Sequence, residues 1–126
     1  LGAGDGRVII EAARSFGARA VGVEIDPERV TRIRNRLDAT GVKANVIQAD
    51  IMDADVSSAD VVTIYLSDSV NWRLAPKLSR ELRAGARIVS LDYILPGWVP
   101  EKELTVNSGG VARKLYLYRV SKLQTN

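Results

Sequence analysis

The stretch Gly2-Ala3-Gly4-Asp5-Gly6 is suited to a loop that binds a nucleotide-like ligand. Three glycines in five positions allow a tight turn and a close approach of the backbone to a ligand, and the helical pattern that follows would present unpaired amides. The dinucleotide pattern G-x-G-x-x-G does not fit, because Arg7 stands where its last glycine is needed. The same glycines could also form only a strand-to-helix turn.

Two carboxylates follow at the ends of the next two predicted strands. Glu24 lies 20 positions after Gly4, and an acid there can accept hydrogen bonds from both hydroxyls of a ribose. Asp50 occupies the same place one strand later, followed by Ile51. The alternatives are a solvated strand-end charge for Glu24 and a helix cap or turn former for Asp50.

Tyr65 and Leu66 end a third apolar strand that is rich in β-branched residues. An aromatic face at such a position can stabilise a cationic amine. A tyrosine at a strand end is equally compatible with a place in the core or at its rim.

Apolar spacing predicts the elements that must position these residues. Asp26 and Pro27 are suited to a helix start, and Gly41 to its end. Pro76 lies inside another helical pattern, so we expect a kink or a restart there. The helices are predicted over residues 7–16, 27–40 and 70–82, and the strands over residues 20–24, 45–49, 60–66, 86–93, 103–106 and 112–120.

Strands that alternate with helices predict an α/β fold, with a doubly wound, mostly parallel Rossmann-like sheet and a C-terminal antiparallel β-hairpin around Ser108-Gly109-Gly110. Ligands bind such sheets at the carboxyl ends of the strands. The glycine loop, both acids, Tyr65 and Asp92 all fall at these ends. No strand precedes the glycine loop in the sequence, so we expect residues 1–126 to form one domain whose first strand lies upstream.

The chain resembles the seven-stranded methyltransferases that depend on S-adenosylmethionine (SAM), through LGAGDGR, VGVEID and the acid at Asp50. Residues 61–100 also resemble the small archaeal protein-lysine methyltransferases and their bacterial and mitochondrial relatives. The shared features are an aromatic-Leu pair at a strand end, V-N followed by L-x-P-K-L and E-L-x-x-G, a strand that begins R-I-V-S, and a G-W-x-P turn.

The resemblance implies SAM as the cofactor and a protein lysine as the methyl acceptor. It implies that Asp50 accepts a bond from the adenine amino group, that the Ile51 amide lies on the ring, and that Tyr65 has the catalytic role. The cofactor contacts that it implies are Gly2, Ala3, Gly4, Glu24, Ile25, Asp50, Ile51, Tyr65 and Leu66. The family usually carries an acid just before the position of Leu1 and an upstream segment with further contacts, and this sequence contains neither.

The amino-acid composition excludes several kinds of catalytic and metal-binding group. The 126 residues include no cysteine and no histidine, which removes thiolate ligands, the commonest zinc ligand and the commonest general base. We therefore expect no metal site, and a cytoplasmic location fits the lack of cysteine. The net charge of +3 gives no clear nucleic-acid signal, and no apolar run is long enough to span a membrane. The sequence does not indicate an oligomeric state.

An amine acceptor must be neutral to attack, against a reference lysine pKa of about 10.4. Desolvation beside a positive sulfonium lowers that pKa, so a dedicated base is not required. Asp53, Asp68 and Asp92 could line the rim of the site and attract a lysine, or could be plain solvated charges. Two other functions stay open: a methyltransferase for a small molecule or RNA, and a non-catalytic binding module.

Overall fold

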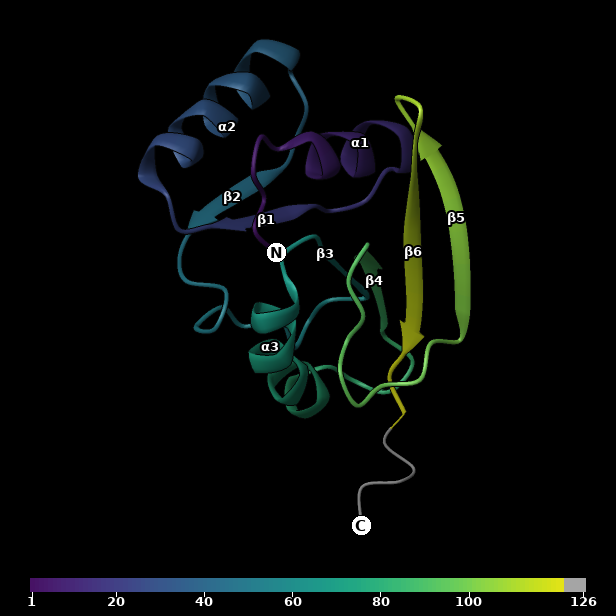
Figure 1. The fold of residues 1–126 in the computed structure, drawn as a ribbon. Helices are drawn as coiled ribbons and strands as arrows, with labels where there is room; N and C mark the ends of the chain where they lie inside the picture. The colour runs from purple at the N-terminus through teal and green to yellow at the C-terminus, as the bar shows by residue number, and fades with distance from the viewer. Residues whose placement is uncertain (122–126) are drawn as a thin grey trace. The chain divides into compact units, whose positions relative to one another are not determined.

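The computed structural model describes residues 1–121, which contain three helices and six strands. The elements divide into two units, one of Leu1–Ala54 and one that begins at Asp55. The first unit runs from purple to blue in Figure 1, and the second from teal to yellow. None of the helices in residues 1–121 has the length and apolar character needed to cross a membrane.

The first unit holds two parallel strands and two helices. Strand β1 (Val21–Glu24) pairs with β2 (Asn45–Gln48) in a register that sets Glu24 opposite Gln48. Helices α1 (Arg7–Phe16) and α2 (Pro27–Thr40) lie on one side of this pair in Figure 1. Their apolar faces form one core with β2, made of Ile9, Ile10, Val30, Ile33, Leu37 and Val46.

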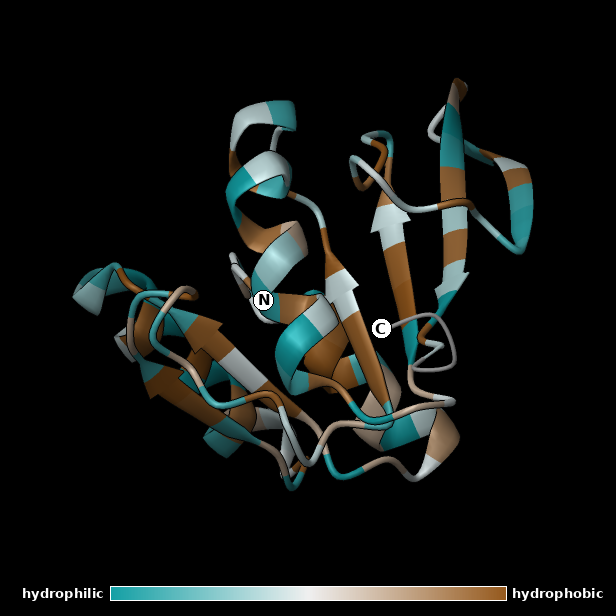
Figure 2. Ribbon diagram, turned by 90° about the horizontal axis from the view of Figure 1, so that it is seen from below, coloured by the Kyte–Doolittle hydropathy of each residue, from teal (hydrophilic) through white to brown (hydrophobic). Residues whose placement is uncertain are grey.

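The second unit is a four-stranded sheet with one helix. The strands are β3 (Val61–Ile64), β4 (Arg87–Leu91), β5 (Lys102–Ser108) and β6 (Val111–Arg119), in the order β3-β4-β6-β5. Strands β3 and β4 are parallel, whereas β6 is antiparallel to both β4 and β5. Helix α3 (Asp68–Glu81) supplies Leu74 and Leu78 to the buried core. Figure 2 shows hydrophobic residues concentrated along the strands and in bands on the helices.

The predicted fold class is confirmed, and every predicted helix and strand is present within a few residues of its expected bounds. Helix α3 begins two residues early because the Ser67 hydroxyl caps it, accepting from the Val70 N–H at 3.3 Å. The expected restart at Pro76 is wrong, since α3 continues through it as one helix. Pro76 and Trp72, whose carbonyl loses its helical donor, are both exposed, so water can satisfy that carbonyl.

The strands form two sheets rather than one within residues 1–121. Strand β1 pairs with β2 along one edge, and along its other edge the Ala3 N–H donates to the Val23 carbonyl at 3.0 Å. That contact comes from the glycine loop and not from a strand. The strand that the sequence predicts upstream of this loop, and the single-domain assignment of residues 1–126, stay predictions.

Candidate functional site

The glycine loop adopts a conformation that side chains disfavour. Gly2, Gly4 and Gly6 have φ angles of 65°, 60° and 80°, in the left-handed region that glycine enters without strain. The Gly6 N–H donates to the Ala3 carbonyl at 2.9 Å, which closes the turn. A Cβ on Gly6 would lie 3.0 Å from Cγ2 of Ile33, so the loop also packs closely on α2. The loop is therefore more than an unconstrained connection.

A fourth glycine, Gly22 of β1, lies directly against the loop and was not part of the predicted site. A Cβ on Gly22 would lie 2.8 Å from the Ala3 Cβ and 3.2 Å from Ile9 Cδ1. Real Cβ atoms do not approach so closely, so this position in β1 must lack a side chain for the loop to rest on the strand. A glycine inside an apolar strand is the sequence signal that could have indicated this close approach.

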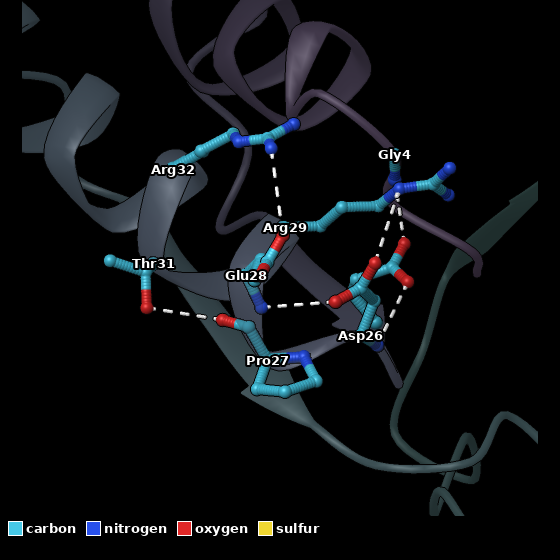
Figure 3. Close-up of polar contacts among 8 residues, drawn as sticks. Gly4, Asp26, Pro27, Glu28, Arg29, Thr31 and Arg32 are labelled. Atoms are coloured by element: carbon cyan, nitrogen blue, oxygen red, sulfur yellow. Dashed lines mark hydrogen bonds and ion pairs between the residues drawn. The ribbon is translucent and has the colours of Figure 1, made fainter.

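Glu24 is buried at the end of β1, with 5% of its surface exposed. Its Oε1 accepts from the Gly4 N–H at 3.0 Å, and its Oε2 accepts from the Asp26 N–H at 3.2 Å. The carboxylate thus ties the glycine loop to the turn that starts α2, and it is not a solvated strand-end charge. Figure 3 shows Gly4 beside this turn.

The carboxylate of Glu24 can still bind a ligand. Each carboxylate oxygen has about two acceptor positions, so a carboxylate can accept more hydrogen bonds than the two from the Gly4 and Asp26 N–H groups. This acceptor capacity suits the hydroxyls of a ribose. The residues present therefore fit the adenosine part of SAM, while the direct contacts stay predictions.

Asp50 lies at the same edge of the β1–β2 pair as Glu24. The parallel register continues past Gln48, because the Ala49 N–H donates to the Glu24 carbonyl at 3.1 Å. Asp50 is exposed and forms a turn, with Oδ1 accepting from the Met52 N–H at 2.9 Å. Asp50 therefore acts as a turn former through one of its two carboxylate oxygens.

The two apolar neighbours differ in exposure. Ile51 is half-buried next to Asp50, whereas Ile25 is 61% exposed directly after Glu24. An exposed isoleucine at a strand end offers an apolar surface to a flat ring. Their assignment to the cofactor stays a prediction.

Three arginines on α2 line an open hollow of about 460 Å³ together with Gly4 and Asp5. The Arg36 guanidinium donates to the Asp5 carbonyl at 3.2 Å, which links α2 to the glycine loop. The other two form long ion pairs: Arg29 Nε lies 3.8 Å from Asp26 Oδ2, and Arg32 Nη2 lies 3.7 Å from Glu28 Oε2. Figure 3 shows the Arg29 side chain extending toward Gly4.

In the second unit, one guanidinium joins the predicted catalytic residue Tyr65 to the predicted rim residue Asp92. Nη1 of Arg113 donates to the Tyr65 hydroxyl at 2.8 Å and to Asp92 Oδ2 at 2.6 Å, and the guanidinium carbon lies 5.7 Å from the centre of the Tyr65 ring. The hydrogen bond to Tyr65, followed by that to Asp92, raises the pKa of Arg113. Tyr65 itself is 52% exposed and thus not a core residue.

Sequence reasoning missed Arg113. The pairing of β6 with β4 could have indicated it, because the antiparallel register sets Leu115 opposite Leu91. Arg113 then falls beside the carboxyl end of β4, where Asp92 lies. Asp92 was predicted at this edge, and the structure pairs it with a cation.

The remaining predicted residues are more dispersed. Leu66 is half-buried just before the Ser67 cap, and Asp68 is exposed in the first turn of α3. Asp53 is exposed in the first unit, so it belongs to a different unit from Asp68 and Asp92. Within residues 1–121 there is no cluster of three or more acidic side chains that could hold a metal ion.

Residues 1–102 match the model of the ANTKMT methyltransferase domain. The chain belongs to this family. It is 39% identical over 125 residues to a protein-lysine N-methyltransferase of Saccharolobus islandicus, which covers 97% of this chain and 78% of that protein. It is 37% identical over 103 residues to the adenine nucleotide translocase lysine N-methyltransferase of Mus musculus, covering 79% of this chain and 44% of the mouse protein. The chain thus spans less than half of that mammalian member.

One similar protein of known structure contains a bound S-adenosyl-L-homocysteine. The RNA methyltransferase from Salinibacter ruber, in complex with S-adenosyl-L-homocysteine, superposes with a TM-score of 0.88 at 41% identity, over 97% of this chain and 78% of that chain. TrmN from Thermus thermophilus shares the fold, with a TM-score of 0.77 at 19% identity. These comparisons confirm the resemblance stated from the sequence, the methyltransferase activity and the use of SAM.

Proposed function

We propose that this member of the ANTKMT methyltransferase family transfers a methyl group from SAM to a lysine side chain of a protein. Two supports come from the relatives, since the archaeal and mouse proteins are both named for lysine methylation. The structural observation that carries the proposal is the glycine loop bonded to the buried Glu24 carboxylate, at the edge where Asp50 also lies.

The first unit holds the cofactor. SAM, when bound, supplies an activated methyl group on a sulfonium. The Glu24 carboxylate would accept from the ribose hydroxyls, and Asp50 would accept from the adenine amino group. The glycine loop would contact the methionine end through its backbone, because Gly2, Ala3 and Gly4 present little side-chain bulk.

We assign Tyr65 to the methyl acceptor. Methyl transfer needs an amine whose lone pair points along the methyl axis, and such positioning can supply much of the acceleration. Tyr65 is exposed at the end of β3, and its hydroxyl oxygen, already held by Arg113, can accept an N–H from the acceptor amine. Its aromatic face suits the methylated, cationic product.

Incorporation of label tests the proposal. The full-length protein is incubated with tritium-labelled SAM and cell extract, and the products are treated separately with protease and ribonuclease. We expect label in a protease-sensitive fraction and on lysine after hydrolysis. Tyr65→Phe should keep cofactor affinity and lose turnover, because only the hydroxyl is removed; unchanged turnover would remove the hydroxyl from the mechanism.

RNA is the second candidate acceptor. It is favoured by the arginine-lined hollow at Arg29, Arg32 and Arg36, whose guanidinium groups suit phosphates, and by the RNA methyltransferase among the similar structures. Label that is sensitive to ribonuclease and lost in an Arg29→Gln/Arg32→Gln/Arg36→Gln variant would support RNA over protein. A cytoplasmic location stays a prediction that fractionation of cells would test.

A further inference from the structure

Arg113, near the start of β6, connects the residues that follow the carboxyl ends of two strands, β3 and β4. It lies in β6, while Tyr65 follows β3 and Asp92 follows β4. Its bonds of 2.8 Å to Tyr65 and 2.6 Å to Asp92 come from the two hydrogens of one nitrogen. The phenol and the carboxylate therefore cannot shift independently.

The backbone at Asp92 is shaped to make this contact. Asp92 has a φ of 66°, and it is the sole non-glycine residue with positive φ in the described part of the chain. Strand β6 holds this conformation, since the Asp92 N–H donates to the Lys114 carbonyl at 2.7 Å and Asp92 Oδ1 accepts from the Lys114 N–H at 3.3 Å. Strained backbone of this kind persists where the surroundings impose it, and functional sites are common among such places.

We propose that Arg113 is a positioning and specificity-determining residue for the methyl acceptor. It fixes the Tyr65 hydroxyl and neutralises Asp92, so that the site takes lysine as the neutral amine. The inference rests on the function proposed above and names a residue that the family resemblance did not supply.

The charged groups around the Arg113 guanidinium indicate how its loss would change the pKa of the acceptor amine. Tyr65 comes directly after β3 and Asp92 directly after β4, and β6 itself contributes Lys114, whose backbone N–H donates to Asp92. Strand β5 sets the uncharged Val106 opposite Arg113. Without Arg113, the Asp92 carboxylate would be left without its close cation. It would then bind the ammonium form of lysine and raise the pKa of that amine, which opposes attack.

The kinetics of Arg113→Met in the full-length protein test this, with the acceptor protein identified by tritium labelling as substrate. We expect kcat to fall about 10- to 100-fold through lost positioning. We expect KM for the acceptor to fall as well, and the pH profile of kcat to move upward by about one unit. Adding Asp92→Asn to Arg113→Met should return the pH profile to its original place but not the lost kcat, because Tyr65 is still unfixed.

Arg119→Met is the matched control. Arg119 is an exposed arginine of the same strand, bonded to Glu101 at 3.0 Å, and it touches neither Tyr65 nor Asp92. The ¹³Cζ resonance of Tyr65, read in protein labelled at its four tyrosines, should move in Arg113→Met and not in the control. Arg113→Lys keeps the charge and should keep the pH profile, which provides a second variant if the methionine variant does not fold.

The outcomes separate the two claims. A wild-type protein that labels no lysine defeats the proposed function. A wild-type protein that labels lysine, with Arg113→Met matching Arg119→Met in KM and pH profile, overturns the role of Arg113 alone. Arg113→Lys with an upward-shifted pH profile would also overturn it, because the positive charge would then not be the cause.

Discussion

Replacing Glu24 with alanine should weaken the folded first unit before any cofactor is added. The side chain is buried and accepts from two backbone amides, those of Gly4 and Asp26. These amides connect the glycine loop and the start of α2 to the end of β1. A variant without the carboxylate leaves both donors without a partner.

The magnitude follows from these two contacts. Both N–H groups are partly buried, and a hydrogen bond to a charged group contributes about 1.5 to 3 kcal/mol, so Glu24→Ala should cost about 3 to 6 kcal/mol of unfolding free energy. Glu24→Gln keeps one acceptor oxygen and turns an amide donor toward the other N–H, so its cost should be about 1 to 3 kcal/mol. Natural domains have only about 5 to 15 kcal/mol in total, so the alanine variant should be visibly destabilised.

Urea denaturation of the full-length protein, followed by circular dichroism, measures this difference. The midpoint should fall in the order wild type, Glu24→Gln, Glu24→Ala, with the slope unchanged. Titration calorimetry with S-adenosylhomocysteine should show weaker binding in the same order. The matched control is Glu28→Gln, because the Glu28 side chain is 81% exposed and reaches Arg32 only at 3.7 Å.

Equal midpoints for Glu24→Ala and the control would refute the reasoning. The glycine loop would then be held by something other than the carboxylate. Normal stability combined with lost binding would leave Glu24 as a ligand contact only, without the bracing role that the hydrogen bonds assign to it.

Three further variants test separate parts of the structure. Asp50→Ala should weaken S-adenosylhomocysteine by about 1 to 3 kcal/mol in calorimetry through an unpaired ligand donor, with little change in the urea midpoint. Gly22→Ala should reduce both stability and cofactor affinity, because its Cβ would lie 2.8 Å from that of Ala3, and equal affinity would show that the loop can shift at no cost. Tyr118, fully buried and bonded to the Leu95 N–H at 2.8 Å, has a phenol pKa raised above 10.0, mainly by desolvation. The neutral phenol is the form that the fold favours, so stability should be constant below about pH 10 and fall as the pH rises through the raised pKa. Tyr118→Phe should lower stability at neutral pH and flatten that alkaline decline in urea midpoints, and an equally steep decline would assign it to other groups.

Local patterns were sufficient to predict the elements, because each is specified by residues close in sequence. Asp26 accepts from the Glu28 N–H at 3.0 Å and Gly41 ends α2 in the left-handed region, as capping rules predict. Pro76 misled the prediction, since its cost depends on whether the unpaired carbonyl reaches water, and exposure is a tertiary property. The parallel strand order then brought Glu24 and Asp50 to one edge.

Sequence alone could not give the side-chain contacts between distant positions. Glu24 was predicted as a ligand, but its bonds to the backbone depend on a loop 20 residues away. Arg113 is 48 residues from Tyr65 and 21 from Asp92, so no local spacing connects them. The left-handed backbone of Asp92 is likewise imposed by β6 rather than by its own sequence neighbours.

The glycine loop is the place where these long-range contacts matter most for binding. Gly22 lets Ala3 rest on β1, the Glu24 carboxylate holds the Gly4 amide, and Gly6 packs on Ile33 of α2. Three contacts from two elements, β1 and α2, therefore fix one short segment that glycine would otherwise make the most mobile part of the unit. A segment ordered before the ligand arrives loses less entropy on binding, so these contacts should raise cofactor affinity without touching the cofactor. The glycines therefore have two different roles. Gly2, Gly4 and Gly6 permit the left-handed backbone of the loop, and Gly22 allows the loop to pack on β1, which holds that backbone in place.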